Sequence, residues 1–166
     1  MPTPAGGGWH TDAMPVLLVR HAQALPRSTW KGDDRARTLS SRGRKQAQGL
    51  VPVLSEFKPH RVFSSPYLRC VETVGPLAEA IGVEVEAVES LAEGDGAAAV
   101  ELVRSLARQD VLLCTHGDII PEILAALANG DGLDLGRNPR QEKGSVWVLE
   151  ARKGRFVKAK YLRPPG

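Results

Sequence analysis

Two short apolar runs that end in histidine stand out in the hydrophobic pattern of this chain. The run Pro15-Val-Leu-Leu-Val-Arg-His21-Ala22 aligns with Asp110-Val-Leu-Leu-Cys-Thr-His116-Gly117, and a small residue follows the histidine in both. Short apolar runs between turn residues are typical of buried parallel strands. Because the carboxyl ends of such strands face the ligand crevice of an α/β sheet, His21 and His116 are expected to meet in one site.

Segments with helical spacing alternate with these strands. Ser40 is a candidate N-cap for a helix with an apolar face of Ala47, Leu50, Val51, Leu54 and Phe57. Ser65-Pro66 predicts the start of a second helix, which Gly82 ends. A third helix is predicted over residues 97–107, and a fourth is predicted after Asp118 as its cap.

The remaining apolar segments complete the predicted architecture. Strands are predicted over 16–20, 61–64, 83–88 and 111–115, with a closing hairpin of 145–150 and 155–162. This alternation favours an α/β three-layer sandwich, with a mostly parallel central sheet flanked by helices and an antiparallel edge. We expect one domain over residues 14–166. The Pro/Gly-rich residues 1–13 lack an apolar core and are predicted to be a disordered leader.

Composition narrows the classes of partner. The net charge is only +3, no long Lys/Arg run occurs, and aromatic residues make up 5% of the chain, which argues against a nucleic-acid partner. The apolar runs are too short to cross a membrane, so no membrane partner is expected. Cys70 and Cys114 both fall in apolar patterns and are interpreted as reduced core residues of a cytoplasmic protein.

Two arginines give the predicted site its chemistry. Arg20 precedes His21 at the end of a strand, and Arg69 falls in the first turn of the second predicted helix. A helix N-terminus favours an anion, and the arginine fork binds phosphate oxygens. A neutral imidazole is a competent nucleophile or a tunable acid or base, although each histidine alone also fits a core position. Together these residues favour phosphoryl chemistry.

An ordered set of motifs resembles a known family. Val19-Arg20-His21-Ala22, Ser64-Ser65-Pro66-Tyr67-Leu68-Arg69, Glu72-Thr73 and Thr115-His116-Gly117-Asp118 are similar to the signature segments of the histidine phosphatase superfamily. That superfamily includes phosphoglycerate mutases, acid phosphatases and small, SixA-like phosphohistidine phosphatases. The resemblance spans residues 16–162. The segments Trp30-Lys31-Gly32-Asp33-Asp34 and Leu39-Ser40-Ser41-Arg42-Gly43 most resemble phosphatase domains fused to Nudix domains in some bacterial proteins, and no Nudix domain is found within these residues.

This resemblance implies a phosphoglycerate mutase-like fold and a metal-free phosphohydrolase without a cofactor. His21 would attack phosphorus and form a phosphohistidine that water then hydrolyses. The phosphate-binding residues implied by the resemblance are Arg20, His21, Arg69, His116 and Gly117. The implied general acid is Glu93, with Glu89 and Asp95 as alternatives. Arg27 and Lys31, in the long loop after the first strand, are expected to contact the substrate beyond its phosphate.

The departures from larger members narrow the expected reaction. Ala22 replaces the glycine that is common after the histidine, and no long insertion forms a lid, so hydrolysis is favoured over mutase activity. The expected substrate is a phosphorylated small molecule such as a sugar phosphate, a nucleotide or a phosphoprotein. Two alternatives remain open. One is a metal-dependent hydrolase that uses His21, His116 and Asp118, although no His-x-His or His-x-x-x-His pair occurs. The other is a phospho-ligand binding module without turnover.

Overall fold

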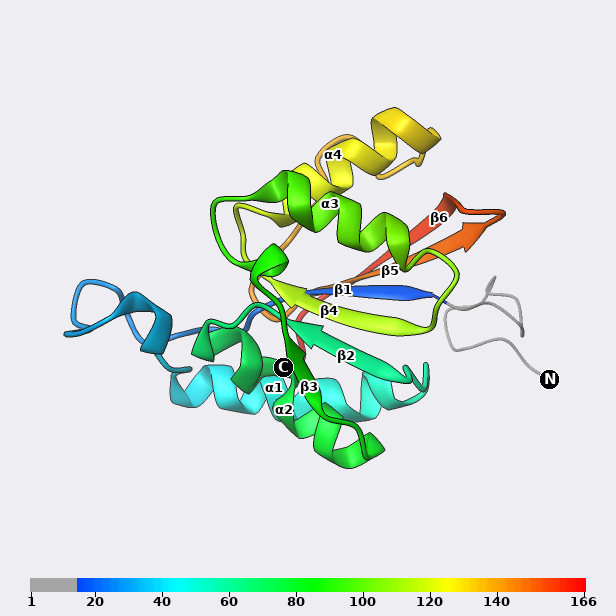
Figure 1. Cartoon of the computed structure of the whole chain (residues 1–166). Helices are drawn as coiled ribbons and strands as arrows, with labels where there is room; N and C mark the ends of the chain where they lie inside the picture. The colour runs from blue at the N-terminus through cyan, green and yellow to red at the C-terminus, as the bar shows by residue number, and fades with distance from the viewer. Residues whose placement is uncertain (1–14) are drawn as a thin grey trace.

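Six strands build one mixed sheet in a computed structural model that describes residues 15–166 (Figure 1). The strands are β1 (Val16–Arg20), β2 (Arg61–Ser64), β3 (Val85–Ala87), β4 (Val111–Thr115), β5 (Val146–Arg152) and β6 (Arg155–Leu162). Their order is β3-β2-β4-β1-β5-β6. Strands β1 to β4 pair in parallel, whereas β5 runs antiparallel to both of its neighbours. The predicted leader, residues 1–13, lies outside the described residues.

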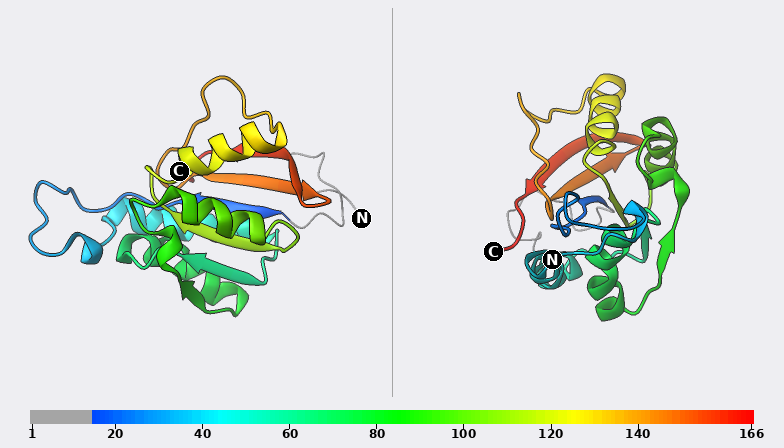
Figure 2. Two further views of the ribbon diagram at one scale, coloured as in Figure 1. Left: turned by 45° about the horizontal axis from the view of Figure 1, so that its top comes forward. Right: turned by 90° about the vertical axis from the view of Figure 1, so that its left-hand side faces the viewer.

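Four helices cover the two faces of this sheet. Helices α1 (Ser41–Ser55) and α2 (Leu68–Ile81) lie on one face, and α3 (Gly96–Ser105) and α4 (Ile120–Asp131) lie on the other (Figures 1 and 2). Two short 3-10 turns, η1 (Asp34–Ala36) and η2 (Glu89–Leu91), interrupt the loops. The predicted α/β sandwich with a mostly parallel sheet is confirmed. No helix within residues 15–166 has the length and apolar character needed to cross a lipid bilayer.

The two core layers explain why the central strands read as continuous apolar runs. Val16 and Leu18 of β1 pack with α3 and α4, whereas Leu17 and Val19 pack with α1 and α2. All four side chains are fully buried. A strand buried on both faces has no solvent-facing position, so the alternation of polar and apolar residues disappears.

Some predicted element boundaries are confirmed and others are wrong. Ser40 caps α1 by accepting a hydrogen bond from the Gly43 amide at 3.1 Å, and Gly82 ends α2 in the left-handed conformation at φ 78°. Ser65 does not cap α2, because the helix begins at Leu68 after Tyr67. Asp118 is not the N-cap of α4 either, since that position belongs to Ile119.

The ends of three other segments also differ from the prediction. Phe57 lies beyond the end of α1 at Ser55, although it packs against the same core layer. Strand β3 is confined to Val85–Ala87, within the longer predicted segment 83–88. Helix α3 runs from Gly96 to Ser105, whereas the predicted helix covers residues 97–107. None of these shifts changes the order of the elements.

The core of the sheet makes a testable contribution to stability. Leu17 is 0% exposed, and its truncation leaves a cavity between β1 and helices α1 and α2. We expect Leu17→Ala to lower the free energy of unfolding by about 2–5 kcal/mol, measured by chemical denaturation. The control Val157→Ala, at a side chain that is 49% exposed, should change it by less than about 0.5 kcal/mol. Equal losses in the two variants would contradict this account of the core.

Candidate active site

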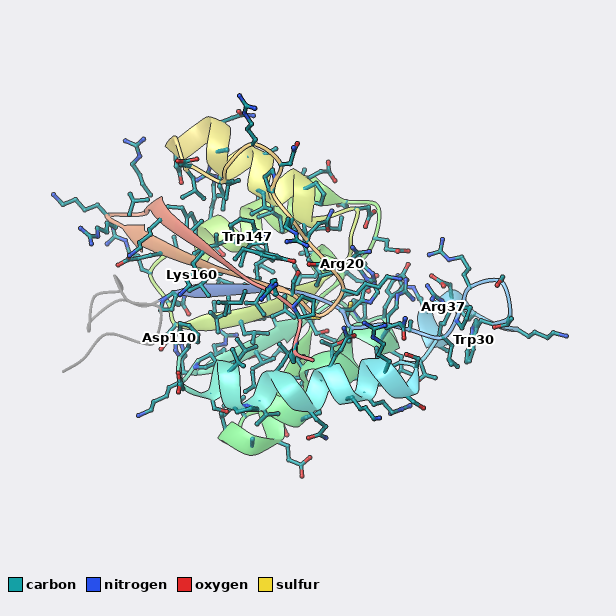
Figure 3. All side chains as sticks on the ribbon, turned by 180° about the vertical axis from the view of Figure 1, so that it is seen from behind. Arg20, Trp30, Arg37, Asp110, Trp147 and Lys160 are labelled. Carbon is teal, nitrogen blue, oxygen red and sulfur yellow. The ribbon has the colours of Figure 1, made fainter. Side chains whose placement is uncertain are left out.

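The pairing of β1 with β4 brings the two histidines to one edge of the sheet. Arg20 lies opposite Thr115 in the parallel register, and the His21 amide donates to the Thr115 carbonyl at 3.1 Å. The imidazole rings of His21 and His116 lie edge to face, with their centroids 5.5 Å apart. Figure 3 shows Arg20 and Arg37 toward one end of the sheet and Asp110 at the other. The expectation that the two strand-end histidines meet is confirmed by this geometry.

A hydrogen bond fixes the tautomer of His21. Its Nδ1 lies 2.8 Å from the Ala22 carbonyl oxygen. A carbonyl oxygen only accepts hydrogen bonds, so Nδ1 carries the ring proton and Nε2 keeps a free electron pair. Burial, opposed by this hydrogen bond and assisted by the charges of Arg69 and Arg20, lowers the pKa of His21 to about 4. The imidazole is therefore neutral near pH 7, as a nitrogen nucleophile must be.

Thr73 on α2 holds the backbone next to this histidine. Its hydroxyl accepts from the Ala22 amide at 2.9 Å and donates to the Arg69 carbonyl at 2.7 Å. A threonine hydroxyl that bonds a carbonyl one turn back along its own helix keeps a second lone pair for another donor. The hydroxyl therefore links the end of β1 to the turn of α2 that carries Arg69.

Ser65 orients the second histidine. Its hydroxyl lies 2.8 Å from His116 Nε2 and accepts from the Tyr67 amide at 3.2 Å. When the hydroxyl proton is donated to Nε2, the imidazole proton sits on Nδ1, which is buried. Burial and the neighbouring His21 lower the pKa of His116 to about 3, so its ring remains a neutral donor. The Ser65 hydroxyl thus has a role in the site that the predicted helix cap did not include.

Arg20 depends on the absence of a side chain at Gly117. Its Nη1 donates to the Gln141 carbonyl at 2.8 Å. A Cβ atom at Gly117 would lie 2.7 Å from Nη2 of the same arginine, closer than real contacts allow. The glycine that follows His116 therefore makes room for the guanidinium at the strand edge.

Arg69 is held by two carboxylates. Its side chain is 0% exposed, and Nη2 lies 3.1 Å from Asp34 Oδ2 and 3.2 Å from Glu93 Oε2. Nη1 donates to the Asp34 carbonyl at 2.9 Å. A buried guanidinium needs such partners, because an isolated charge is costly to remove from water.

Three buried donors in this site have no hydrogen-bond partner within residues 15–166. They are Nε of Arg20, Nε of Arg69 and Nδ1 of His116. Buried polar atoms are paired in most proteins, and an unpaired group at a functional site indicates a ligand atom. The N–H groups of two guanidinium groups and an imidazole are suited to the oxygens of a phosphoryl group.

Arg20, His21 and Arg69 line a pocket of about 380 Å³. Its cationic side chains are Arg20, Arg27, Arg37, Arg69 and Lys143, and its acidic ones are Glu93 and Asp118. Gly117 also lines it, whereas Lys31 is exposed in the loop after β1 and is not among the lining residues described. The excess of cations gives the pocket a positive potential that attracts anions.

Asp34 organises the arginines of this pocket, and the sequence analysis missed its role. Arg37 Nε lies 2.9 Å from Oδ1, Arg69 Nη2 lies 3.1 Å from Oδ2, and Arg27 Nε is 3.9 Å from Oδ1. Burial raises the pKa of Asp34, but the hydrogen bond from Arg37 and the charge of Arg69 outweigh it and lower the pKa overall. The only signal in the sequence was a long loop rich in charged residues.

The three candidate acids have different surroundings. Glu93 lines the pocket, with Oε2 at 3.6 Å from His116 Nδ1 in addition to its contact with Arg69. Glu89 instead pairs with Arg35 at 2.9 Å, and Asp95 caps α3 by accepting from the Ala98 amide at 3.2 Å. Of the three carboxylates, Glu93 alone is placed to reach a group bound between the arginines.

The other predicted ligand sets have different positions. Within residues 15–166, no three or more His, Cys, Asp or Glu side chains are grouped to hold a metal ion. Asp118 accepts from the Gly94 amide at 3.1 Å, which fixes the loop that carries Glu93. Cys70 and Cys114 are free, buried thiols, and burial raises the pKa of Cys114.

The family to which the chain belongs follows from its sequence relatives. The model of the histidine phosphatase superfamily (branch 1) matches residues 16–99. Over 160 residues, 93% of this chain, the sequence is 34% identical to an 8-oxo-(d)GTP phosphatase of Mycolicibacterium smegmatis (strain ATCC 700084 / mc(2)155). The chain belongs to the histidine phosphatase superfamily. It spans about half of that relative, 49% of its length.

Solved structures show the same fold. A protein histidine phosphatase SixA, solved in complex with tungstate, matches with a TM-score of 0.72 and 18% identity. The match covers 92% of this chain and 97% of that chain. A mycobacterial glucosyl-3-phosphoglycerate phosphatase in complex with VO3 matches with a TM-score of 0.70 and 19% identity, over 93% and 100% of the two chains. The predicted phosphoglycerate mutase-like, SixA-like fold is therefore confirmed.

The lowered pKa values make the site sensitive to pH in a defined direction. His21 and His116 bind protons less readily in the folded chain than at their ordinary pKa of 6.5. The unfolded chain therefore takes up more protons as the pH falls from about 6.5 to about 4, and the free energy of unfolding decreases over that interval. Denaturation at several pH values should show a shallower decrease in His21→Ala/His116→Ala.

Nuclear magnetic resonance of the imidazole nitrogens provides a direct test of the same values. Both rings should remain neutral at pH 5.5, with the proton of His21 on Nδ1, and each single alanine variant assigns one set of signals. A ring that becomes protonated near pH 6.5 would contradict the lowered pKa of that histidine.

Proposed function

We propose that this chain removes a phosphoryl group without a metal ion, through a phosphohistidine intermediate on His21. The observation that carries the proposal is the set of three unpaired buried donors beside the free electron pair of His21 Nε2. A nucleophile and fixed N–H groups directed at the transferring phosphoryl oxygens are the requirements of phosphoryl transfer. The positive pocket supplies the attraction for an anionic substrate.

The first step transfers the phosphoryl group to the protein. Nε2 of His21 forms a bond to phosphorus as the bond from phosphorus to the leaving oxygen breaks. Arg20, Arg69 and His116 donate to the three phosphoryl oxygens. The positive charge that develops on the imidazole is stabilised by the hydrogen bond from Nδ1 to the Ala22 carbonyl. The leaving oxygen takes a proton from the Glu93 carboxyl group.

The second step regenerates the histidine. Water attacks phosphorus and gives a proton to the Glu93 carboxylate, and the bond between Nε2 and phosphorus breaks to release orthophosphate. A bound phosphoryl group accepts hydrogen bonds from Arg69, whose Nη2 lies 3.2 Å from Glu93 Oε2 in this structure.

The proposed substrates are phosphorylated small molecules, nucleotides and phosphoproteins. A nucleotide is supported by the relative described as an 8-oxo-(d)GTP phosphatase. Arg27 lines the pocket away from the strand edge and is proposed to contact the part of the substrate beyond its phosphate. Lys31 remains a prediction for the same role from the exposed loop.

Hydrolysis of 4-nitrophenyl phosphate in EDTA tests the mechanism. We expect the wild type to turn over and His21→Ala to lose more than about a thousandfold in kcat, because the nucleophile is gone. Intact-protein mass measurement after rapid quenching in alkali, where the bond between nitrogen and phosphorus is stable, should detect one added phosphoryl group on the wild type only. Loss of activity in EDTA would favour the metal-dependent alternative. Phosphate binding without turnover or phosphoenzyme would favour the binding module.

Leaving-group dependence tests the acid. Glu93→Gln should lower kcat/KM for an alkyl phosphate by about 10²–10³, because an alkoxide leaves poorly without a proton. The loss on 4-nitrophenyl phosphate should be less than about tenfold, since nitrophenolate leaves as an anion. The matched control is Glu89→Gln, whose carboxylate pairs with Arg35 outside the pocket and should leave both rates unchanged. Equal losses on the two substrates would instead make Glu93 a positioning residue for Arg69.

A further inference from the structure

The phosphate pocket adjoins a second, larger groove. This groove has a volume of about 710 Å³, and Lys143 lines both spaces. Gln23, two residues after His21, lies at its wall, and Arg42, Arg140 and Arg163 supply further cations. A ligand that binds at His21 and extends past Lys143 would therefore meet a basic surface.

The two spaces differ in how their charges are neutralised. In the phosphate pocket, Asp34 pairs with Arg37 and Arg69. In the groove, Arg42, Lys143 and Arg163 form no ion pair with any of residues 15–166, and only Arg140 has an acidic partner, Glu142 at 3.0 Å. Unneutralised positive charge thus extends from the pocket toward the groove rather than toward the loop that carries Asp34. Such a gradient favours an anion with charge at more than one point.

Lys143 experiences this excess of charge directly. Burial, together with the charges of Arg20, Arg37, Arg27 and Arg69, lowers the pKa of its ammonium group. Cations that repel one another in a partly buried place are stabilised when an anion is shared between them. Lys143 lines both spaces, so its ammonium group is a candidate contact for the oxygen that leaves with the rest of a substrate.

The segment that contains Lys143 is hydrogen-bonded to the end of β1, which carries His21. Gln46 of α1, only 8% exposed, accepts from the Gln23 amide at 3.0 Å and donates to the Lys143 carbonyl at 3.3 Å. The Gly144 amide lies 3.1 Å from the carbonyl oxygens of both Arg20 and His21. Lys143 therefore lies on a segment whose position relative to His21 is set by several hydrogen bonds.

We propose that this groove is a second anion site, which binds the non-transferred phosphates of a polyphosphorylated small molecule whose terminal phosphoryl group lies at His21. The inference rests on the proposed phosphatase function and names its substrate class, of which a nucleoside triphosphate is one member. No aromatic side chain among the described residues lines either space, so recognition relies on charge rather than on stacking.

The bond that breaks in such a substrate is a phosphoanhydride. Nε2 of His21 bonds to the terminal phosphorus, and the bridging oxygen leaves with its electron pair as part of the shortened polyphosphate. Its negative charge is met by Lys143 and the groove arginines. Water then cleaves the bond between nitrogen and phosphorus and releases orthophosphate, as in the proposed second step.

Kinetics on two substrates test the groove. Wild type and Arg42→Ala/Arg163→Ala are assayed in EDTA with inorganic tripolyphosphate and with 4-nitrophenyl phosphate. The ratio of kcat/KM for tripolyphosphate to that for the aryl phosphate should fall at least about tenfold in the double variant, since two charged contacts are lost. The matched control is Lys45→Ala, an exposed cation on the same helix that does not line the groove; it should leave the ratio unchanged. An unchanged ratio in the double variant overturns the proposal.

A binding measurement separates this proposal from the phosphatase mechanism. Calorimetry with His21→Ala, which lacks the nucleophile, measures affinity for tripolyphosphate and orthophosphate without turnover. Adding Arg42→Ala/Arg163→Ala should weaken tripolyphosphate about tenfold and orthophosphate less than about twofold. If the double substitution weakens tripolyphosphate binding while the wild type shows no turnover of any substrate, the groove proposal is supported and the phosphatase mechanism is overturned. The groove proposal is overturned if tripolyphosphate binds His21→Ala with the same affinity whether or not Arg42 and Arg163 are replaced. It is also overturned if the wild type hydrolyses a phosphohistidine peptide but does not bind tripolyphosphate.

Discussion

The parallel pairing of β1 with β4 is the constraint on which the rest of the structure depends. It places Arg20 beside Thr115 and brings His21 and His116 to the same edge, so one sheet register sets the geometry of the reactive groups. Both strands are buried on their two faces, and helices cover each side. The stability of the core and the position of the imidazoles therefore have the same origin, because a shift of register would misplace both.

Charge balance is the second organising principle. Arg69 is fully buried, and the carboxylates of Asp34 and Glu93 hold it in the absence of a phosphoryl group. The same two acids compete with any anion that enters the pocket. Glu93 lies within 3.2 Å of Arg69 and 3.6 Å of His116. The loop residue Asp34 retains Arg37 when Arg69 is taken by a ligand.

Local sequence patterns were sufficient to predict the order of the strands and helices and the proximity of the two histidines. Apolar runs and helical spacing were enough to predict the element order and the meeting of His21 with His116. Local patterns could not predict the role of a residue whose partners are distant in the sequence. Ser65 reads as a helix cap, but its hydroxyl bonds His116 across 51 residues. Asp34 gathers three arginines from the loop and α2, and Lys143 joins two spaces; nothing nearby in the sequence signals either role.

The hydrogen bond between His21 and its own neighbour has a stereochemical consequence. The Nδ1 proton is donated to the Ala22 carbonyl, so only Nε2 of the ring has a free electron pair. The main chain therefore prevents Nδ1 from acting as a nucleophile. A phosphohistidine formed by the proposed mechanism would then be a single regioisomer, substituted at the nitrogen remote from the backbone. Reagents that distinguish the two isomers of phosphohistidine would therefore report whether the hydrogen bond from His21 Nδ1 to the Ala22 carbonyl directs the reaction to Nε2.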